Sequence, residues 1–188
     1  MLSYKDFFIP ISDEKITLKD ALKQMKSCSS DPTEVPFIVR LVENPNLKLP
    51  LFRVFNGAVD LYTHDCIHLI LGRGLLAKDE AFVIGFTMGS TKKMFKSEKF
   101  LYHFVTEYLY PHPFKFTHKE HMVFDIASAI ADVSKCERLD KIDFKDMENM
   151  SLKKIREKIG LEDKFLLDAY TLEKDMFPNE IDSKRLLL

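Results

Sequence analysis

The chain has 188 residues, of which 46% are hydrophobic and 30% charged, a composition that is globular rather than disordered or fibrous. Its 28 basic and 29 acidic side chains nearly cancel, which excludes a general affinity for nucleic acid. Three scattered cysteines exclude a disulfide framework, and no apolar run approaches the roughly 18 residues of a membrane span. The first residues show neither a secretory nor a transit pattern, so we expect a cytoplasmic protein. The length suits one compact core, and we expect a single domain over residues 1–188.

The predicted elements are helices throughout. Helical periodicity and proline or glycine breaks place them, in chain order, at residues 17–29, 33–43, 51–71, 79–95, 97–110, 117–133, 151–159 and 162–174. Thr117 and Glu120 form a capping-box pattern, which predicts a helix start. Gly160 follows the predicted helix 151–159 directly, and glycine is the residue favoured in the left-handed conformation that ends a helix. Strand-like alternation is nearly absent, and we expect the last ten residues to be loose. The sequence therefore predicts an all-α, single-domain bundle of about seven to eight helices.

A candidate metal site begins with His64 and His68, four residues apart in the predicted helix 51–71. At ~100° per residue, their imidazoles leave the same helix face within about 40° of each other and can bind one ion. A turn at the following Gly-Arg-Gly break would let Glu80 face both histidines from the first turn of the next helix, where the dipole favours a carboxylate. Asp65 can add an oxygen ligand or orient an imidazole. Histidines at this spacing also occur by chance, so the pattern alone leaves both interpretations open.

Three known metalloenzyme patterns do not match these residues. A zincin protease has His-Glu-x-x-His, whereas Asp65 is one carbon shorter than the required glutamate. An HD-type phosphohydrolase has a histidine upstream of its His-Asp pair, and no histidine precedes His64 in this chain. A ferritin-like di-iron site has two Glu-x-x-His units, and the chain contains none.

The order His64-Asp65-x-x-His68, then eleven residues, then Glu80 resembles the His-Asp-x-x-His-x11-Glu signature of the coenzyme Q biosynthesis protein four family. The stretch SLKKIREKIGL is similar to the closing Leu-x-x-x-Arg-x-x-x-Gly-Ile pattern of that family. The similarity covers about residues 44–161 and leaves 162–188 as a C-terminal extension. Two departures are the polar turn after Gly72 and the poor match of the first forty residues.

The resemblance implies an all-α protein of ubiquinone biosynthesis in which His64, Asp65, His68 and Glu80 bind a divalent metal, zinc or iron. It implies an isoprenoid quinone precursor as ligand, other ubiquinone-biosynthesis proteins as partners, and peripheral contact with the inner face of a membrane. The implied activity is C1 ring modification, an oxidative decarboxylation or hydroxylation of a prenylated 4-hydroxybenzoate-derived precursor, or organisation of the biosynthetic complex. A homodimer is compatible with it. Two alternatives stay open: a non-catalytic lipid-binding scaffold with a structural metal, and an unrelated metal-dependent hydrolase on a helical bundle.

Small and aromatic residues recur in the predicted helix 79–95. Gly85 and Gly89 lie on one face, and Phe82 and Phe86 are close by. Small residues there predict either a channel for an isoprenoid chain beside the metal or close packing of a neighbouring helix. Since an interior glycine costs ~1 kcal/mol and usually has a steric reason, packing is the plainer interpretation.

Two further patterns have both a functional and a plain interpretation. His118, His121 and Asp125 have helical ligand spacing, although polar side chains at a helix start are usually solvated. A basic stretch interleaved with aromatic residues consists of Lys92, Lys93, Lys96 and Lys99. It predicts either contact with anionic lipid headgroups or an ordinary solvated face.

Overall fold

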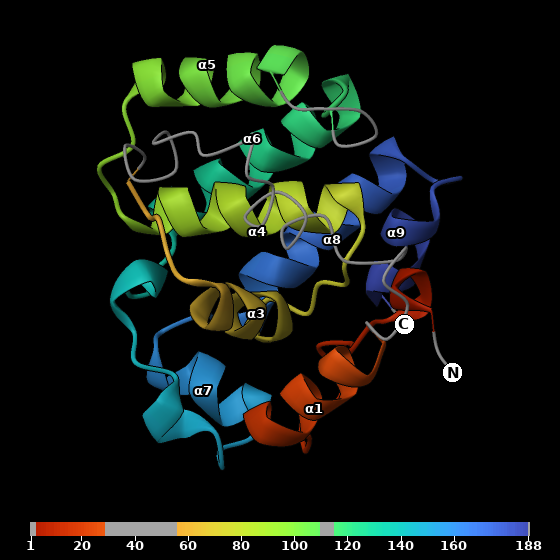
Figure 1. Ribbon diagram of the computed structural model, residues 1–188, viewed down its shortest axis with the longest axis vertical. Helices are drawn as coiled ribbons and strands as arrows, with labels where there is room; N and C mark the ends of the chain where they lie inside the picture. Colours follow the sequence, from red (N-terminus) through yellow and green to blue (C-terminus); the bar gives the residue numbers. More distant parts are fainter. Residues whose placement is uncertain (1–2, 29–55, 110–114, 188) are drawn as a thin grey trace.

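The computed structural model describes residues 3–28, 56–109 and 115–187, and within them the fold is all-α (Figure 1). The eight α-helices of these residues are α1 (Leu18–Cys28), α3 (Leu61–Ile70), α4 (Ala77–Ser90), α5 (Lys96–Phe104), α6 (His118–Val133), α7 (Leu152–Lys158), α8 (Asp163–Met176) and α9 (Ile181–Lys184). A π-helical turn, Val105–Leu109, continues α5. The predicted all-α bundle of about seven to eight helices is confirmed, whereas the helix predicted over 33–43 lies outside the described residues.

Two helices are shorter than their sequence patterns indicated. The helix predicted over 51–71 begins only at Leu61 in the described residues, because the Asp60 side chain accepts a hydrogen bond from the Thr63 N–H at 2.7 Å and caps it there. α4 ends at Ser90 and not at residue 95, since Lys92 takes a left-handed φ of 55° that a helix cannot continue through. The hydrophobic periodicity of the sequence continues beyond the start of α3 and beyond the end of α4. It therefore could not predict where these two helices begin and end.

α4 is the central helix, packing against α6, α3 and α9 (Figure 1). It buries side chains around its whole circumference, as an interior helix does. α3 also contacts α1 and α7, and α6 contacts α8. Apolar side chains from Phe7 near the start of the chain to Leu186 near its end form one buried cluster. Every described helix falls short of the length and apolarity that a bilayer span needs.

The glycine face of α4 is filled by α6. A Cβ added at Gly85 would overlap the carbonyl oxygen of Phe124 and lie 3.0 Å from its Cα, and a Cβ at Gly89 would overlap the α6 backbone in the same way. The nearby Phe82 and Phe86 are fully buried and stack on each other with ring centroids 6.0 Å apart. Close packing against α6 therefore takes the space along this face, in agreement with the plainer of the two interpretations of these glycines.

The last residues of the chain pack on the fold instead of remaining loose, and this corrects the sequence-based expectation. α9 and the turn Arg185–Leu187 bury the side chains of Asp182 and Ser183. The guanidinium of Arg185 donates from Nη1 to the backbone carbonyl of Lys5 at 3.0 Å. The sequence pattern could not show this packing, because the polar groups that hold the segment bind partners far away along the chain.

Candidate metal centre

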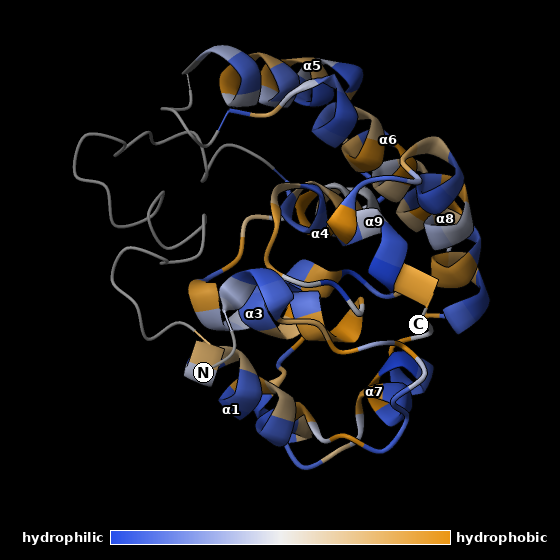
Figure 2. Cartoon of the chain, turned by 90° about the vertical axis from the view of Figure 1, so that its right-hand side faces the viewer, coloured by the Kyte–Doolittle hydropathy of each residue, from blue (hydrophilic) through white to orange (hydrophobic). Residues whose placement is uncertain are grey.

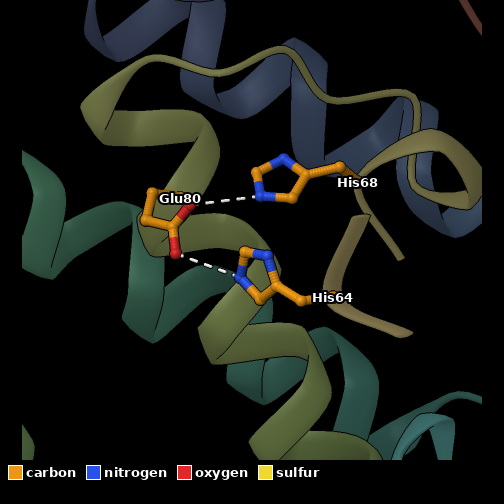
Figure 3. A group of neighbouring side chains, drawn as sticks. All are labelled: His64, His68 and Glu80. Atoms are coloured by element: carbon orange, nitrogen blue, oxygen red, sulfur yellow. Dashed lines mark hydrogen bonds and ion pairs between the residues drawn. The ribbon is translucent and has the colours of Figure 1, made fainter. Parts of the chain in front are cut away.

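The candidate site lies where α3 and α4 face each other. His64 and His68 occupy successive turns of α3, and Glu80 lies in the first turn of α4 (Figure 3). The distance from His64 Nε2 to Glu80 Oε1 is 3.0 Å, and that from His68 Nε2 to Glu80 Oε2 is 3.1 Å. One carboxylate thus faces both imidazoles, which is the arrangement that the spacing and the glycine break led us to expect.

The turn between the helices positions these side chains. α3 ends because Gly72 takes a left-handed φ of 59°, and the Arg73 N–H donates to the His68 carbonyl at 2.9 Å. α4 begins after Leu76, whose backbone N–H donates to the Asp79 carboxylate at 3.0 Å. The loop is short, so it returns α4 directly beside α3. The first turn of α4 then presents its acidic side chains where the helix dipole stabilises negative charge.

The three side chains are buried together. His64, His68 and Glu80 expose 7%, 1% and 4% of their surface. Burial alone would raise the pKa of Glu80, but attraction to His64 and His68 outweighs it and holds this pKa well below its usual range. Burial likewise tends to lower the pKa of His64, and attraction to Glu80 more than compensates, so this pKa is raised. The carboxylate is therefore ionised, and its surroundings favour a positive charge between the three groups.

Unpaired polar atoms mark the same place. Within the described part of the chain, both ring nitrogens of His64 and Oε1 of Glu80 are buried without a hydrogen-bond partner. His64 Nε2 and Glu80 Oε1 face each other as an ion pair at 3.0 Å, and His64 Nδ1 has neither kind of partner there. The Nδ1 of His68 lies 2.8 Å from the carbonyl oxygen of Gly74, which only accepts, so Nδ1 carries a hydrogen. Nε2 lies 3.1 Å from Oε2 of Glu80, and an ionised carboxylate also only accepts. A proton on Nε2 or a metal ion between the two atoms satisfies this contact, and the arrangement fits a bound ion.

The donor set determines which ions the group can hold. Two imidazole nitrogens and a carboxylate, with ligand atoms within 4.8 Å of one another, can hold a metal ion. It is the one such group found in residues 3–28, 56–109 and 115–187. Nitrogen and oxygen ligands of this kind suit zinc or iron rather than copper(I). Within the described residues the group has three ligands, which is the number that a catalytic zinc site takes from the protein.

Asp65 does not join this group. It directly follows His64, and successive side chains on an α-helix diverge by ~100°. It remains an electrostatic neighbour: burial raises the pKa of Asp65, against the attraction of His68 and His64. Of the four residues that the motif resemblance implied as ligands, the structure brings together His64, His68 and Glu80, and Asp65 lies outside this group.

The second ligand set considered from the sequence does not form. His121 stacks on His103 of α5 with ring centroids 4.3 Å apart, and its Nε2 lies 3.0 Å from Thr106 Oγ1. Asp125 pairs with His103 Nε2 at 3.1 Å, and His118 is exposed. No signal in the sequence pointed to His103, because its contact with α6 depends on how α5 packs. This cluster is a side-chain contact between α5 and α6.

Comparisons with known proteins add no relative: no family model, no curated protein and no solved structure matches the chain. The motif resemblance in the sequence and the geometry of the site concern the same side chains, His64, His68 and Glu80. The geometry establishes a buried group of three side chains that can hold a metal ion.

Proposed function

We propose that this protein is a metal-dependent enzyme that binds one divalent ion, zinc or iron, through His64, His68 and Glu80. The observation that carries the proposal is the convergence of these three buried side chains, two of them with polar atoms that have no other partner in the described residues. Burying an ionised carboxylate beside two imidazoles is costly unless a cation compensates it. A bound ion accounts for the arrangement directly.

The number of ligands favours a catalytic ion over a structural one. Structural zinc sites are closed by four protein ligands, whereas catalytic sites keep a position for water or substrate. Two histidines with one carboxylate are the set used both by zinc hydrolases and by non-haem iron oxygenases. In the described residues the group contains three ligands, which supports an enzyme over the alternative of a lipid-binding scaffold.

For the substrate we propose a prenylated 4-hydroxybenzoate-derived precursor and modification at its C1 position, in ubiquinone biosynthesis. Support comes from the resemblance carried by His64, Asp65, His68 and Glu80. The C1 carboxylate of such a precursor suits an open site, because one ligand carboxylate leaves a divalent ion with net positive charge. Such an ion would supply Lewis acidity that polarises the ring. The oxidative step needs dioxygen or another electron acceptor, which favours iron.

Elemental analysis of the purified chain tests this proposal. We expect about one metal ion per chain in the wild type and near-complete loss in His64→Ala, His68→Ala and Glu80→Gln, because each removes one of three ligands. His118→Ala is the matched control, since this histidine is exposed and does not belong to the ligand group, and it should retain the metal. A wild type that takes up neither iron nor zinc would refute the metal site.

Activity assays then separate the reaction classes. Incubation of the iron-loaded chain with a prenylated 4-hydroxybenzoate and dioxygen should release carbon dioxide and form a ring-hydroxylated product in the wild type alone. Turnover of an ester or phosphate substrate by the zinc-loaded chain would instead establish the hydrolase alternative. A wild type that holds its ion without any exchangeable water would support the structural-metal scaffold.

We also propose an anionic membrane surface as the partner of α5, which lies at the opposite end of the molecule from α1 and α7 (Figures 1 and 2). Phe95 and Phe100 there are 68% and 74% exposed, and Lys93 and Lys96 are exposed beside them. Aromatic and basic side chains side by side are typical of interfacial helices. The rest of the basic stretch has structural partners, since Lys92 donates to carbonyls at the end of α6 and Lys99 pairs with Asp125.

A further inference from the structure

The orientation of the His68 imidazole depends on one backbone carbonyl. The Nδ1–H of His68 donates to the carbonyl oxygen of Gly74 at 2.8 Å, and this hydrogen bond is buried. Such a bond fixes both the tautomer and the rotation of the ring, so that Nε2 points to the ion position. Anything that fixes Gly74 therefore acts on the metal site through His68.

Arg185 fixes Gly74 from the C-terminal end of the chain. A Cβ at Gly74 would overlap Nη2 of Arg185 and lie 2.6 Å from the carbonyl oxygen of Phe7, so glycine is what lets the guanidinium pack directly against this turn. The guanidinium is itself held in place, because Nη1 donates to the carbonyls of Lys5 at 3.0 Å and Phe7 at 3.3 Å. The turn is thus enclosed between α3 and a positioned arginine.

The same guanidinium reaches the helix that carries Glu80. Nη2 of Arg185 pairs with Oδ2 of Asp79, and that oxygen also accepts the Leu76 N–H at 3.0 Å. Asp79 therefore caps the first turn of α4 while bound to Arg185, and the next residue is the ligand Glu80. One side chain from the end of the chain touches the supports of two of the three ligands.

A second connection joins the C-terminal segment to the same turn. Arg73 lies between the rings of Phe82 and Tyr170, with its guanidinium carbon 3.7 Å and 4.4 Å from their centroids. Its Nη2 pairs with Glu173 Oε2 at 2.6 Å, and Oε1 of this glutamate accepts a hydrogen bond from the Ser183 hydroxyl at 2.9 Å. All these polar groups are buried, and Ser183 is 0% exposed.

Stability alone does not explain so many buried charges. Replacing a buried ion pair by apolar residues is often neutral or stabilising, because desolvation offsets the attraction. Buried ionic groups are better explained where they fix one particular geometry. Here both arginines act on the turn between His68 and Glu80, where the geometry of the ligands is set.

We infer that the segment Ile181–Leu187 is a C-terminal clasp that positions His68 and Glu80 for metal binding, with Arg185 as its main positioning residue. The inference rests on the proposed metal site and extends it by assigning a role to residues that touch no metal ligand side chain. Outer partners of metal ligands typically account for 10–100-fold in metal affinity. Loss of the Arg185 guanidinium should weaken Zn²⁺ binding by a factor in that range.

The test compares Arg185→Met with wild type in the full chain, using Zn²⁺ alone as the probe in competition with a chromophoric chelator. Methionine keeps an apolar stem and removes every donor. Arg138→Met is the matched control, since Arg138 pairs with Asp140 at 2.8 Å and contacts no group of the turn in the described residues. We expect about 10–100-fold weaker zinc binding in Arg185→Met and unchanged binding in the control. Circular dichroism shows that each variant is folded at the assay temperature.

A second measurement tests, without any metal, whether Arg185 fixes the tautomer of the His68 imidazole. Nitrogen-15 NMR of the neutral imidazole of His68 should show the Nδ1–H tautomer in the metal-free wild type and a mixture of tautomers in Arg185→Met. Wild-type zinc affinity together with an unchanged tautomer in Arg185→Met would overturn the inference. A wild type that shows the Nδ1–H tautomer but binds no zinc would refute the proposed function and leave the positioning of His68 established.

Ser183→Ala covers the case in which Arg185→Met does not fold. It removes only the hydroxyl that donates to Glu173, a loss that folded proteins usually tolerate. Zinc binding several-fold weaker than wild type would support the clasp. Wild-type zinc binding by a folded Ser183→Ala, with Arg185→Met unfolded, would overturn it.

Discussion

Glu80→Gln separates metal binding from folding more sharply than any other substitution in the site. The amide has the shape of the carboxylate, so packing between α3 and α4 is preserved, but the charge that faces His64 and His68 at 3.0 Å and 3.1 Å is lost. An ion that binds only the folded state stabilises it by about 2.7 kcal/mol at 100 times its Kd. For a chain of this size, 1 kcal/mol corresponds to roughly 2–4 °C in Tm. The wild type should therefore gain about 5–11 °C when zinc is added.

The assay is thermal unfolding with and without zinc, followed by circular dichroism, and repeated with a chelator. We expect Glu80→Gln to lose nearly all of the zinc-dependent gain. Glu157→Gln, which removes an exposed acidic charge on α7, should keep the gain of the wild type. Equal gains in Glu80→Gln and wild type would show that zinc binds elsewhere, and the reasoning from the three converging side chains would then be refuted.

Three further predictions concern the supports of the site and the surface of the molecule. Asp60→Ala should lower the free energy of unfolding by about 1 kcal/mol in urea titrations at neutral pH, because it removes the cap of α3. The hydrogen bonds to Thr63 lower the pKa of Asp60 in the folded state. The stability that Asp60 contributes is therefore fully present above its pKa in the unfolded chain, and it should be lost as the pH falls through its pKa in the folded protein. Urea titrations repeated at acidic pH check this. Gly85→Ala should destabilise by about 1–3 kcal/mol in spite of alanine's better helix propensity, since its Cβ meets the α6 backbone; equal or higher stability in calorimetry would contradict the packing argument. Lys93→Glu with Lys96→Glu should abolish sedimentation with phosphatidylserine vesicles, and retained sedimentation would argue against α5 as the membrane contact.

Local signals in the sequence were sufficient for most helices of the described residues. The capping box of Thr117 and Glu120 begins α6 as predicted, and Gly160 takes a left-handed φ of 71° after α7. The same is true of the turn that brings Glu80 to the two histidines, because a glycine at the end of a helix is a local requirement. Each of these features depends on residues that are close together in the chain.

The features that the sequence did not predict depend on contacts between distant segments. Periodicity could not decide whether the face of Gly85 borders a ligand or another helix, since both require a small residue. The C-terminal segment looked polar and loose because its partners, such as Glu173 and Asp79, lie on other helices. Motif matching placed Asp65 with the ligands, whereas the structure groups His64, His68 and Glu80 without it.

The pairing of Arg185 with Asp79 spans 106 positions of the chain, and this separation has a consequence for biosynthesis. Translation proceeds from the N-terminus, so the histidines and Glu80 leave the ribosome long before Arg185 is made. If Arg185 positions the ligands as we infer, a nascent chain that bears the ligands but lacks this guanidinium would bind the ion more weakly. Full affinity would follow only once Arg185 has been synthesised and has reached Asp79.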